Sequence, residues 1–253
     1  SEAEEEEEPT AYDKGDNEPV TEPTARVLVV EDNAELLQLF VDSLQDRFVV
    51  TAARDGSEAL QILENEPIDV VVSDVMMPRT GGLELTRRIK SSLELCHIPV
   101  VLLTAKTTTE AKEEGLSVGA DVYLDKPVSL RQLKHQLRNL MRLKQVMQQR
   151  IQASPYYAAV GQALPKRDQE FLEKLHDEID SRMADMDFSI DSLADTMFMS
   201  RSNFYRKIKS LTGMAPNHYL RAVRLKKAAY LLTRDSRINE VYEQVGFSSS
   251  SYF

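Results

Sequence analysis

The stretch "DVVVSDVMMPRTGG", residues 69–82, decides how this chain folds. Its consecutive valines form an apolar run of the kind that is buried on both faces of a parallel sheet. Asp74 ends the run, and a proline and two glycines follow, so the strand stops and the chain turns there. We therefore expect a buried strand that presents an acidic side chain at its carboxyl end.

Four further apolar runs surround this one. They are "RVLVV" (26–30), "FVVTAA" (48–53), "PVVLLTA" (99–105) and "DVYLDK" (121–126). The segments between them carry apolar residues at helical spacing, as Leu36, Phe40 and Leu44 do. Alternating strands and helices predict an α/β fold, a doubly wound, flavodoxin-like parallel sheet of five strands with helices on both faces. After Pro127 the remaining pattern is helical throughout.

Charge divides the chain of 253 residues, whose net charge is −10. Residues 1–127 contain 11 basic and 28 acidic residues, whereas residues 128–253 contain 20 and 13. In the stretch 201–237, ten residues are basic and one is acidic. An acidic half suits cation binding, and a basic half suits a polyanionic partner, although a solvated basic face is the simpler reading.

Composition limits the remaining possibilities. The single cysteine, Cys96, excludes an internal disulfide and a cysteine metal cluster, and it fits a reducing cytoplasm. No apolar run approaches the length of a membrane span, so we expect no membrane contact by this segment. Residues 1–25 are acidic and contain several prolines, which predicts a disordered linker.

Polar residues follow the successive predicted strands. In an open α/β sheet, ligands bind outside the carboxyl ends of the strands. The residues at those ends are Glu31, Asp32, Asp74, Thr104 and Lys126. Three carboxylates repel one another unless a hard cation such as Mg²⁺ binds them, and a lysine and a hydroxyl beside them suit a phosphoryl group. This set predicts a phosphoryl site in which Asp74 is the nucleophile.

The motifs "VLVVEDN", "DVVVSDVMMPRTGGLEL", "VVLLTAK" and "GADVYLDKP" resemble the receiver domain of two-component response regulators, over residues 26–147. The resemblance implies that Glu31, Asp32 and Asp74 hold Mg²⁺ with the main-chain carbonyl of Met76. It also implies that Asp74 accepts phosphate from a histidine kinase.

The same resemblance assigns three further roles. Thr104 and Lys126 contact the phosphoryl group, and Tyr123 is the aromatic switch residue that moves with Thr104. The Lys126–Pro127 bond corresponds to one that is cis in the family. Aspartyl-phosphate hydrolases need a second acid two residues after the nucleophile, and Met76 stands there, so we reject a turnover phosphatase.

The segment "FSIDSLADTMFMSRSNFYRKIKSLTG" (188–213) predicts two short helices joined by a turn, the second capped by Ser200. Phe204, Ile208 and Leu211 form the buried face of the second helix. The opposite face carries Ser202, Asn203, Arg206, Lys209 and Ser210, with Tyr205 at its flank. Such a face suits a recognition helix in the major groove, with Arg206 on guanine, Asn203 on adenine and Lys209 on phosphate. An ordinary exposed helix is the alternative.

The plan of short helix, turn and capped helix recurs in "INEVYEQVGFSSSSYF" (238–253). Two such units joined by a longer helix resemble the AraC-type DNA-binding domain, over residues 167–253. The resemblance makes Ser202, Tyr205 and Arg206 contacts of the first unit, and Ser250 and Ser251 the first contacts of the second. Phe198 replaces a frequent turn glycine. Because Phe253 ends the sequence one turn into the last helix, we expect the second unit to be incomplete.

Together these patterns predict a phosphorylation-dependent transcriptional regulator: receiver, a linker over 148–166, and an all-α double helix-turn-helix domain that binds double-stranded DNA. We expect a homodimer when it is phosphorylated, and no enzymatic turnover by this segment. The acidic stretch before the receiver resembles the cytoplasmic tail of a hybrid sensor of the inner membrane, with the histidine kinase in the same parent chain. The alternative is a receiver-containing interaction module that does not bind DNA.

Overall fold

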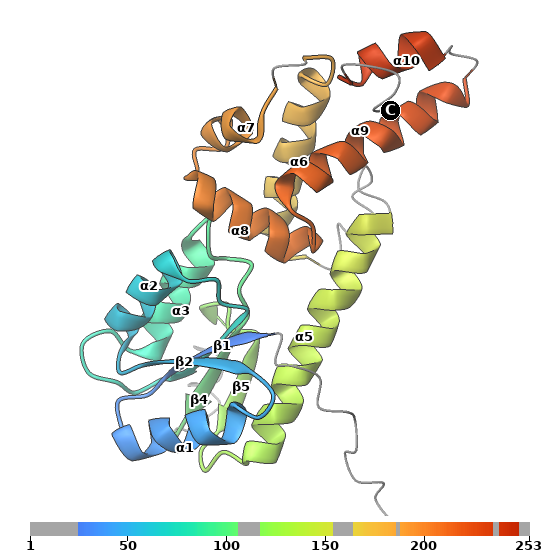
Figure 1. Ribbon diagram of the computed structural model, residues 1–253. Coiled ribbons are helices and arrows are strands. Elements are labelled where there is room, and N and C mark those ends of the chain that lie inside the picture. The colour runs from blue at the N-terminus through green and yellow to red at the C-terminus, as the bar shows by residue number, and fades with distance from the viewer. Residues whose placement is uncertain (1–24, 106–116, 154–163, 186–187, 235–237, 248–253) are drawn as a thin grey trace, which may run out of the picture.

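A computed structural model describes residues 25–105, 117–153, 164–185, 188–234 and 238–247 (Figure 1). The first part is a parallel sheet with strand order β2-β1-β3-β4-β5. Its strands are β1 (Arg26–Val30), β2 (Val49–Ala53), β3 (Val70–Asp74), β4 (Val100–Thr104) and β5 (Val122–Asp125). The predicted five-stranded α/β fold is confirmed, and β3 and β4 are buried along their whole length.

Helices cover both faces of the sheet. They are α1 (Ala34–Leu44), α2 (Gly56–Asn65), α3 (Gly82–Ser91) and α5 (Leu130–Ala153). Leucines of α1 and α5 pack with Val27 and Val72 on one face, whereas α2 and α3 pack with Leu28 and Val71 on the other. Alternate residues of a strand point to opposite faces, so one apolar strand serves two cores.

The second part of the chain is helical, as predicted. Its helices are α6 (Lys166–Ser181), α7 (Ile190–Thr196), α8 (Arg201–Thr212), α9 (Pro216–Leu232) and α10 (Ile238–Gln244). The Ser200 side chain caps α8 by accepting a hydrogen bond from the Asn203 amide, and Gly213 ends it in the left-handed conformation. Phe171, Phe204 and Tyr219 are the largest buried apolar side chains of their common core.

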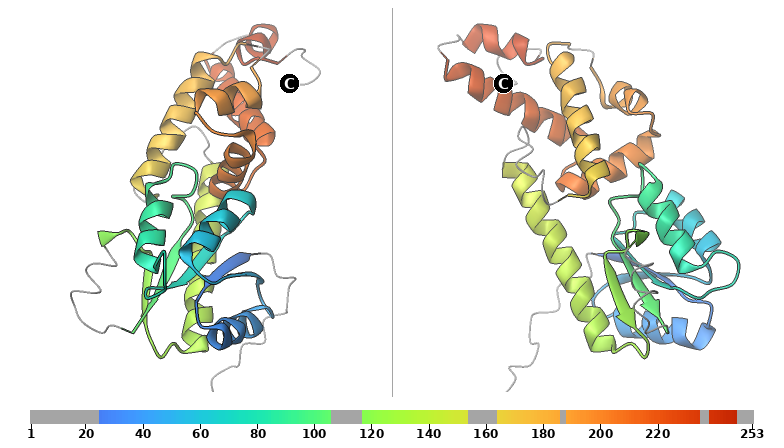
Figure 2. Two further views of the ribbon diagram at one scale, coloured as in Figure 1. Left: turned by 90° about the vertical axis from the view of Figure 1, so that its left-hand side faces the viewer. Right: turned by 180° about the vertical axis from the view of Figure 1, so that it is seen from behind.

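Helix α5 extends beyond the sheet to the helical part (Figures 1 and 2). It includes residues 148–153, which the sequence assigned to the linker. There the Gln148 and Gln152 side-chain amides donate hydrogen bonds of 2.8 Å to the carbonyls of Ser210 and Thr212, at the end of α8. Helix α5 therefore contacts both the parallel sheet and the last turn of α8.

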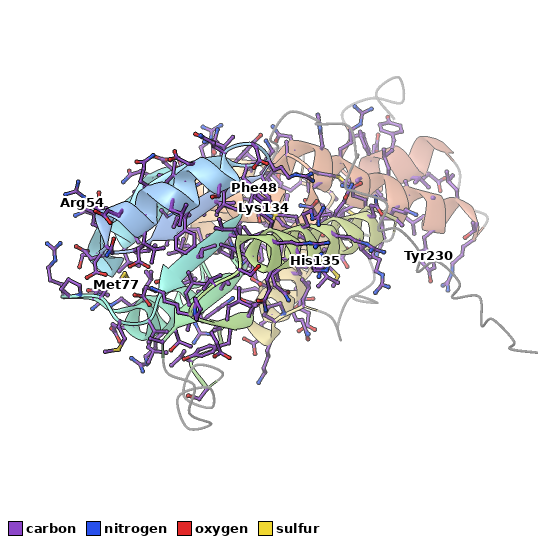
Figure 3. All side chains as sticks on the ribbon, turned by 90° about the horizontal axis from the view of Figure 1, so that it is seen from below. Phe48, Arg54, Met77, Lys134, His135 and Tyr230 are labelled. Carbon is purple, nitrogen blue, oxygen red and sulfur yellow. The ribbon has the colours of Figure 1, made fainter. Side chains whose placement is uncertain are left out.

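The Lys126–Pro127 peptide bond is cis, as the resemblance implied. Among the described residues, no helix combines the length and apolarity that a membrane crossing requires. In Figure 3, Arg54 and Met77, which follow β2 and β3, lie toward one end of the molecule, and Tyr230 of α9 lies toward the other. The carboxyl edge of the sheet therefore faces away from the helical part.

A substitution at Gly82 tests how tightly the loop after β3 is packed. A Cβ at residue 82 would lie 2.1 Å from the Asp74 carbonyl oxygen, a backbone atom that does not move aside. We expect Gly82→Ala to lower the free energy of unfolding by about 1–3 kcal/mol, although alanine favours helices by about 1 kcal/mol. Urea unfolding measures this loss.

Gly81→Ala is the matched control. Its Cβ would lie 3.0 Å from the nearest atom, the Val75 carbonyl oxygen, and the backbone φ of −75° suits any residue. A loss at residue 81 equal to that at residue 82 would contradict the assignment of the close contact to Gly82.

Candidate functional site: a carboxylate cluster and a helix-turn-helix

Three carboxylates meet at the carboxyl edge of the sheet. Glu31, Asp32 and Asp74 each offer an oxygen, and these oxygens lie within 4.8 Å of one another. Glu31 and Asp32 follow β1, and Asp74 is the last residue of β3, which pairs with β1. Parallel neighbouring strands therefore bring the acids together, as the sequence predicted.

Asn33 caps α1 in this loop, so Asp32 is not needed as the cap. The Asn33 side chain accepts hydrogen bonds of 3.0 Å from the amides of Glu35 and Leu36. The Asp32 side chain is exposed, whereas Glu31 and Asp74 are buried. One accessible and two buried carboxylates form a set of hard oxygen ligands that fits a divalent cation such as Mg²⁺.

Lys126 supplies the positive charge that this cluster needs. Its Nζ lies 2.8 Å from Glu31 Oε2 and 2.9 Å from Asp74 Oδ2. Burial alone would lower the pKa of the Lys126 ammonium, but its hydrogen bonds to Glu31 and Asp74 outweigh burial and raise that pKa. Burial raises the pKa of the Glu31 carboxyl, against the hydrogen bond from Lys126. Lys126 therefore remains charged. Ionised Glu31 has a free-energy cost of burial that its hydrogen bond from Lys126 does not fully offset.

The other predicted receiver residues lie around this cluster. Thr104 is fully buried at the end of β4, and its carbonyl accepts a 2.6 Å hydrogen bond from the Lys126 amide. Tyr123 is half-buried in β5 and pairs with Leu102, which lies on the same face of β4 as Thr104. Met76 is in the loop after β3, and its side chain is exposed. The structure thus places all of these residues at the carboxyl edge or beside it.

The turns after α7 and after α10 share one geometry. After α7, the amides of Phe198 and Met199 donate to the carbonyls of Asp195 and Ala194 at 2.9 and 3.0 Å. After α10, the amides of Gly246 and Phe247 donate to the carbonyls of Glu243 and Tyr242 at 3.0 and 2.9 Å. This is the helix-ending pattern that needs a left-handed residue.

Phe198 and Gly246 occupy that left-handed position, with φ of 55° and 75°. Phenylalanine therefore adopts the conformation that glycine adopts more readily, and the residue remains 88% exposed. The turn therefore forms with Phe198 in place of the frequent glycine, as it does with Gly246 after α10. Ser250 and Ser251, which we expected to contact DNA in the second unit, lie outside the described residues.

The predicted recognition face of α8 divides into two sets. Ser202, Tyr205 and Lys209 are exposed. Asn203 and Arg206 instead bind the receiver, at the amino edge of its sheet, and Figures 1 and 2 show α8 lying against the ends of α2 and α3. The structure therefore does not leave the whole face open to a ligand.

Arg206 binds the last turn of α2. Its Nη1 donates to the Glu66 carbonyl at 3.1 Å, and its Nη2 donates to the Glu64 carbonyl at 2.5 Å. Carbonyls at a helix C-terminus carry partial negative charge, so a guanidinium is well placed there. Asn203 donates to the Glu94 carboxylate and accepts a hydrogen bond from Arg206.

A buried ion pair lies beneath this contact. Lys207 Nζ is 2.6 Å from Asp168 Oδ1, and both side chains are almost fully buried. Cys96 of the receiver contacts both, with Sγ 3.4 Å from Lys207 Nζ and 3.3 Å from Asp168 Oδ1. Within the described residues, Asp168 Oδ2 has no hydrogen-bond partner. The ion pair thus joins α6 to α8, and Cys96 of the receiver covers it.

The sequence contained a signal for this pair that we did not use. Lys207 follows Phe204 by three residues and precedes Leu211 by four, so it stands on the apolar face of α8. A lone lysine on an apolar face predicts a buried partner. The α2 carbonyls carry no comparable signal, because a main-chain acceptor exists at every residue.

Two family models match the chain. They are a response regulator receiver domain over residues 27–138 and a helix-turn-helix domain over residues 193–253. The chain is 30% identical over 228 residues to histidine kinase P4 of Formosa agariphila. The aligned region covers 90% of this chain and 17% of that protein.

Two shorter proteins are also similar to this chain. The chain is 30% identical over 187 residues to the uncharacterised transcriptional regulatory protein YrkP of Bacillus subtilis (strain 168), covering 72% of this chain and 78% of YrkP. It is 40% identical over 118 residues to response regulator MprA of Mycobacterium sp. (strain KMS), covering 46% of this chain and 50% of MprA.

The chain therefore belongs to the response regulators and joins a receiver domain to an AraC-type helix-turn-helix domain. It spans about half the length of MprA and about a sixth of histidine kinase P4.

A substitution of Lys207 tests the buried ion pair. Lys207→Met leaves the Asp168 carboxylate buried without its cation, and we expect a loss of about 3–5 kcal/mol in the free energy of unfolding. Adding Asp168→Leu removes the stranded charge and recovers most of that loss. Urea unfolding of the single and double variants measures both effects.

The surface pair of Lys166 and Glu170, 3.7 Å apart, is the control. Lys166→Met changes the same charge at an exposed position, so we expect a change within about 1 kcal/mol. If Lys207→Met costs no more than Lys166→Met, the buried pair does not stabilise the protein.

Proposed function

We propose that phosphorylation of Asp74 controls DNA binding by the AraC-type domain of this chain. The observation that carries the proposal is the carboxylate cluster of Glu31, Asp32 and Asp74, with Lys126 paired to two of its members, in the same chain as a helix-turn-helix domain. The receiver supplies the acceptor, and the helical part supplies the output. A receiver implies a histidine kinase as phosphodonor, and a helix-turn-helix implies DNA as partner.

Asp74 acts as the nucleophile in this proposal. One carboxylate oxygen forms a bond to the phosphorus of a phosphohistidine, and the phosphorus–nitrogen bond breaks. The electron pair of that bond returns to the imidazole, which takes up a proton. Lys126 and the Thr104 hydroxyl then hold the phosphoryl oxygens, because Lys126 already lies 2.9 Å from Asp74.

Glu31, Asp32, Asp74 and the main-chain carbonyl of Met76 would hold Mg²⁺. The ion supplies positive charge that neutralises the transferred phosphoryl oxygens. Glu31 supports this assignment, because burial already raises the pKa of its carboxyl and a second cation would relieve that cost. Tyr123 is the switch residue, on the same face of the sheet as Thr104. The segment accepts and loses one phosphoryl group and turns over no other substrate.

The DNA contacts of the first unit are Ser202, Asn203, Tyr205, Arg206 and Lys209, and those of the second begin at Ser250 and Ser251. Arg206 is suited to guanine, and Asn203 is suited to adenine. Lys209 is suited to phosphate, which fixes position on the duplex without reading sequence. A homodimer, formed on phosphorylation, would place two such domains on repeated half-sites.

The receiver restrains these contacts in a closed arrangement. Arg206 and Asn203 donate to Glu64, Glu66 and Glu94 of the receiver, so the same donors are not available to base edges. We propose that this is the inactive state, and that phosphorylation shifts an equilibrium toward an open state. Helix α5 begins close after Lys126 and ends beside α8, so it is the physical connection between the two ends.

The phosphodonor belongs to the same parent chain in this proposal. The alignment to histidine kinase P4 includes 90% of this chain, which supports a hybrid in which a kinase, a receiver and a DNA-binding domain are joined. The segment would then lie in the cytoplasm, attached to an inner-membrane sensor. Phosphotransfer and DNA binding both require that location.

Asp74→Asn tests the acceptor. We expect it to abolish labelling by a radioactive small phosphodonor, because an amide does not form an acyl phosphate. It should also abolish the gain in DNA affinity that the phosphodonor produces. Asp46→Asn removes an equal charge from an exposed carboxylate that pairs with Lys134, and should label as the parent protein does. Persistent labelling of Asp74→Asn would falsify the assignment.

Glu94→Lys tests the closed arrangement from the receiver side, without changing a DNA contact. It removes the acceptor of Asn203 and places a like charge near Arg206. We expect the unphosphorylated protein to bind DNA about tenfold more tightly, which is about 1.4 kcal/mol. Fluorescence anisotropy at constant salt concentration measures the affinity, because DNA binding depends steeply on salt.

Glu64→Lys is the matched control. Its side chain is exposed and makes no hydrogen bond or ion pair with a described residue, although its carbonyl accepts from Arg206. The added charge is the same, so an equal gain from Glu64→Lys would mean that net charge, and not the contact of Glu94, limits DNA binding.

A further inference from the structure

A cleft of about 1200 Å³ lies between the two domains. Its walls are the amino edge of the receiver sheet, the middle of α5 from His135 to Gln148 and the polar face of α8. His135 of α5, labelled in Figure 3, is one lining residue. The phosphoryl site does not line this cleft, whereas four of the proposed DNA contacts of α8 do: Asn203, Tyr205, Arg206 and Lys209. The proposed function does not say what occupies the space between α8 and the receiver.

The cleft is basic. Seven of its lining residues are arginine or lysine, and three are aspartate or glutamate. Lys144 is paired with Asp69 at 2.6 Å, and Arg206 is bonded to the α2 carbonyls. Four cationic side chains form no ion pair with any described residue: Arg26, Arg47, Arg142 and Lys209. Like charges around one cavity repel, so an anionic occupant would stabilise it.

The chain itself provides an anion at the rim of this cleft. Ala25 and Arg26 line the cleft, and residues 1–24 lead directly into them. That segment contains ten acidic residues and one lysine, a net charge of −9. Glu18 precedes Ala25 by seven positions, so Glu18 stays within about 25 Å of the rim in any conformation.

We propose that residues 1–24 dock in this cleft as a tethered polyanion. Their carboxylates pair with Arg47 and Arg142 on the receiver and with Lys209 on α8, and so bridge the two domains. Tethering makes the association intramolecular, with an effective concentration of about 1 mM or more. Because the segment binds cations of both domains, it stabilises the closed arrangement.

The segment also competes with DNA. Lys209 is a proposed phosphate contact, and it would be neutralised by carboxylates of the same chain before DNA arrives. Binding at one site that opposes binding at another is reciprocal, so DNA must displace the segment and the segment must weaken DNA binding. This second consequence rests on the proposed DNA-binding function, whereas docking of the segment does not.

Cross-linking tests docking directly in the unphosphorylated full chain. A carbodiimide joins a carboxylate to a lysine amine without a spacer, and mass spectrometry maps the products. We expect links from acids of residues 1–24 to the cleft lysines, Lys144 and Lys209, and these should fall at about 1 M salt, where charges are screened within about 3 Å.

Lys134, Lys166 and Lys174 are the internal controls, because they do not line the cleft. Links spread evenly over these lysines and the cleft lysines would overturn the proposal, and so would the absence of links to Lys144 and Lys209. The experiment contains no DNA, so its outcome is independent of the proposed function.

A charge variant then tests the competition. It replaces five carboxylates by amides: Glu4→Gln, Glu5→Gln, Glu6→Gln, Glu7→Gln and Glu8→Gln. We expect the unphosphorylated variant to bind DNA about tenfold more tightly at about 50 mM salt. Arg47→Gln with Arg142→Gln removes the receiver's share of the docking site and should give a similar gain.

Combining both sets should add little beyond either set alone, because they remove one shared interaction. If duplex DNA occupies the cleft in place of the segment, the arginine variant weakens DNA binding and the glutamate variant leaves it unchanged, which overturns the proposal. If the cross-links form but no variant binds DNA, docking stands and the proposed function fails.

Discussion

Repulsion among the carboxylates of Glu31, Asp32 and Asp74 is the constraint on which the arrangement depends. Oxygens within 4.8 Å of one another need a cation, and Lys126 binds two of the three acids. Lys126 reaches them from the end of β5 and is followed by the cis bond to Pro127 and then by α5. A change of charge at Asp74 therefore alters the ion pairs that hold Lys126, which precedes α5 in the chain.

Helix α5 connects the carboxylate cluster to the far end of the molecule. The carboxylate cluster is at the carboxyl edge, whereas α8 lies at the amino edge, and α5 passes from one to the other (Figure 1). Its last turns bind the carbonyls of Ser210 and Thr212, and a Cβ at Gly213 would lie 2.6 Å from the Gln152 amide nitrogen. A shift of α5 would therefore reach the end of α8 through these two hydrogen bonds.

The sequence predicted the sheet and its acidic edge well, since both follow from local pattern. Apolar runs predict strands, and the residue after each run predicts what lies at the strand end, so Asp74 and Lys126 were placed correctly. The domain contact was not predicted. Arg206 binds main-chain carbonyls, which have no sequence signature, and the reading of its face as open to DNA assumed that no other part of the chain covers it. Lys207, a charged residue on the apolar face of α8, was a sequence signal that this part of the helix is covered.

The acceptors that hold Arg206 are chemically similar to those it would meet on DNA. Two carbonyl oxygens of α2 lie within 3.1 Å of its guanidinium, and guanine also offers two acceptors to an arginine. Exchanging one set for the other changes the free energy little, because hydrogen bonds of the same type are lost and gained. The closed arrangement is then favoured by a small difference in free energy, to which Glu94, the buried ion pair of Lys207 and the surrounding charges contribute. A switch requires such a small difference in free energy, since a ligand or modification that favours one state by about 5.5 kcal/mol moves a two-state equilibrium almost completely to that state.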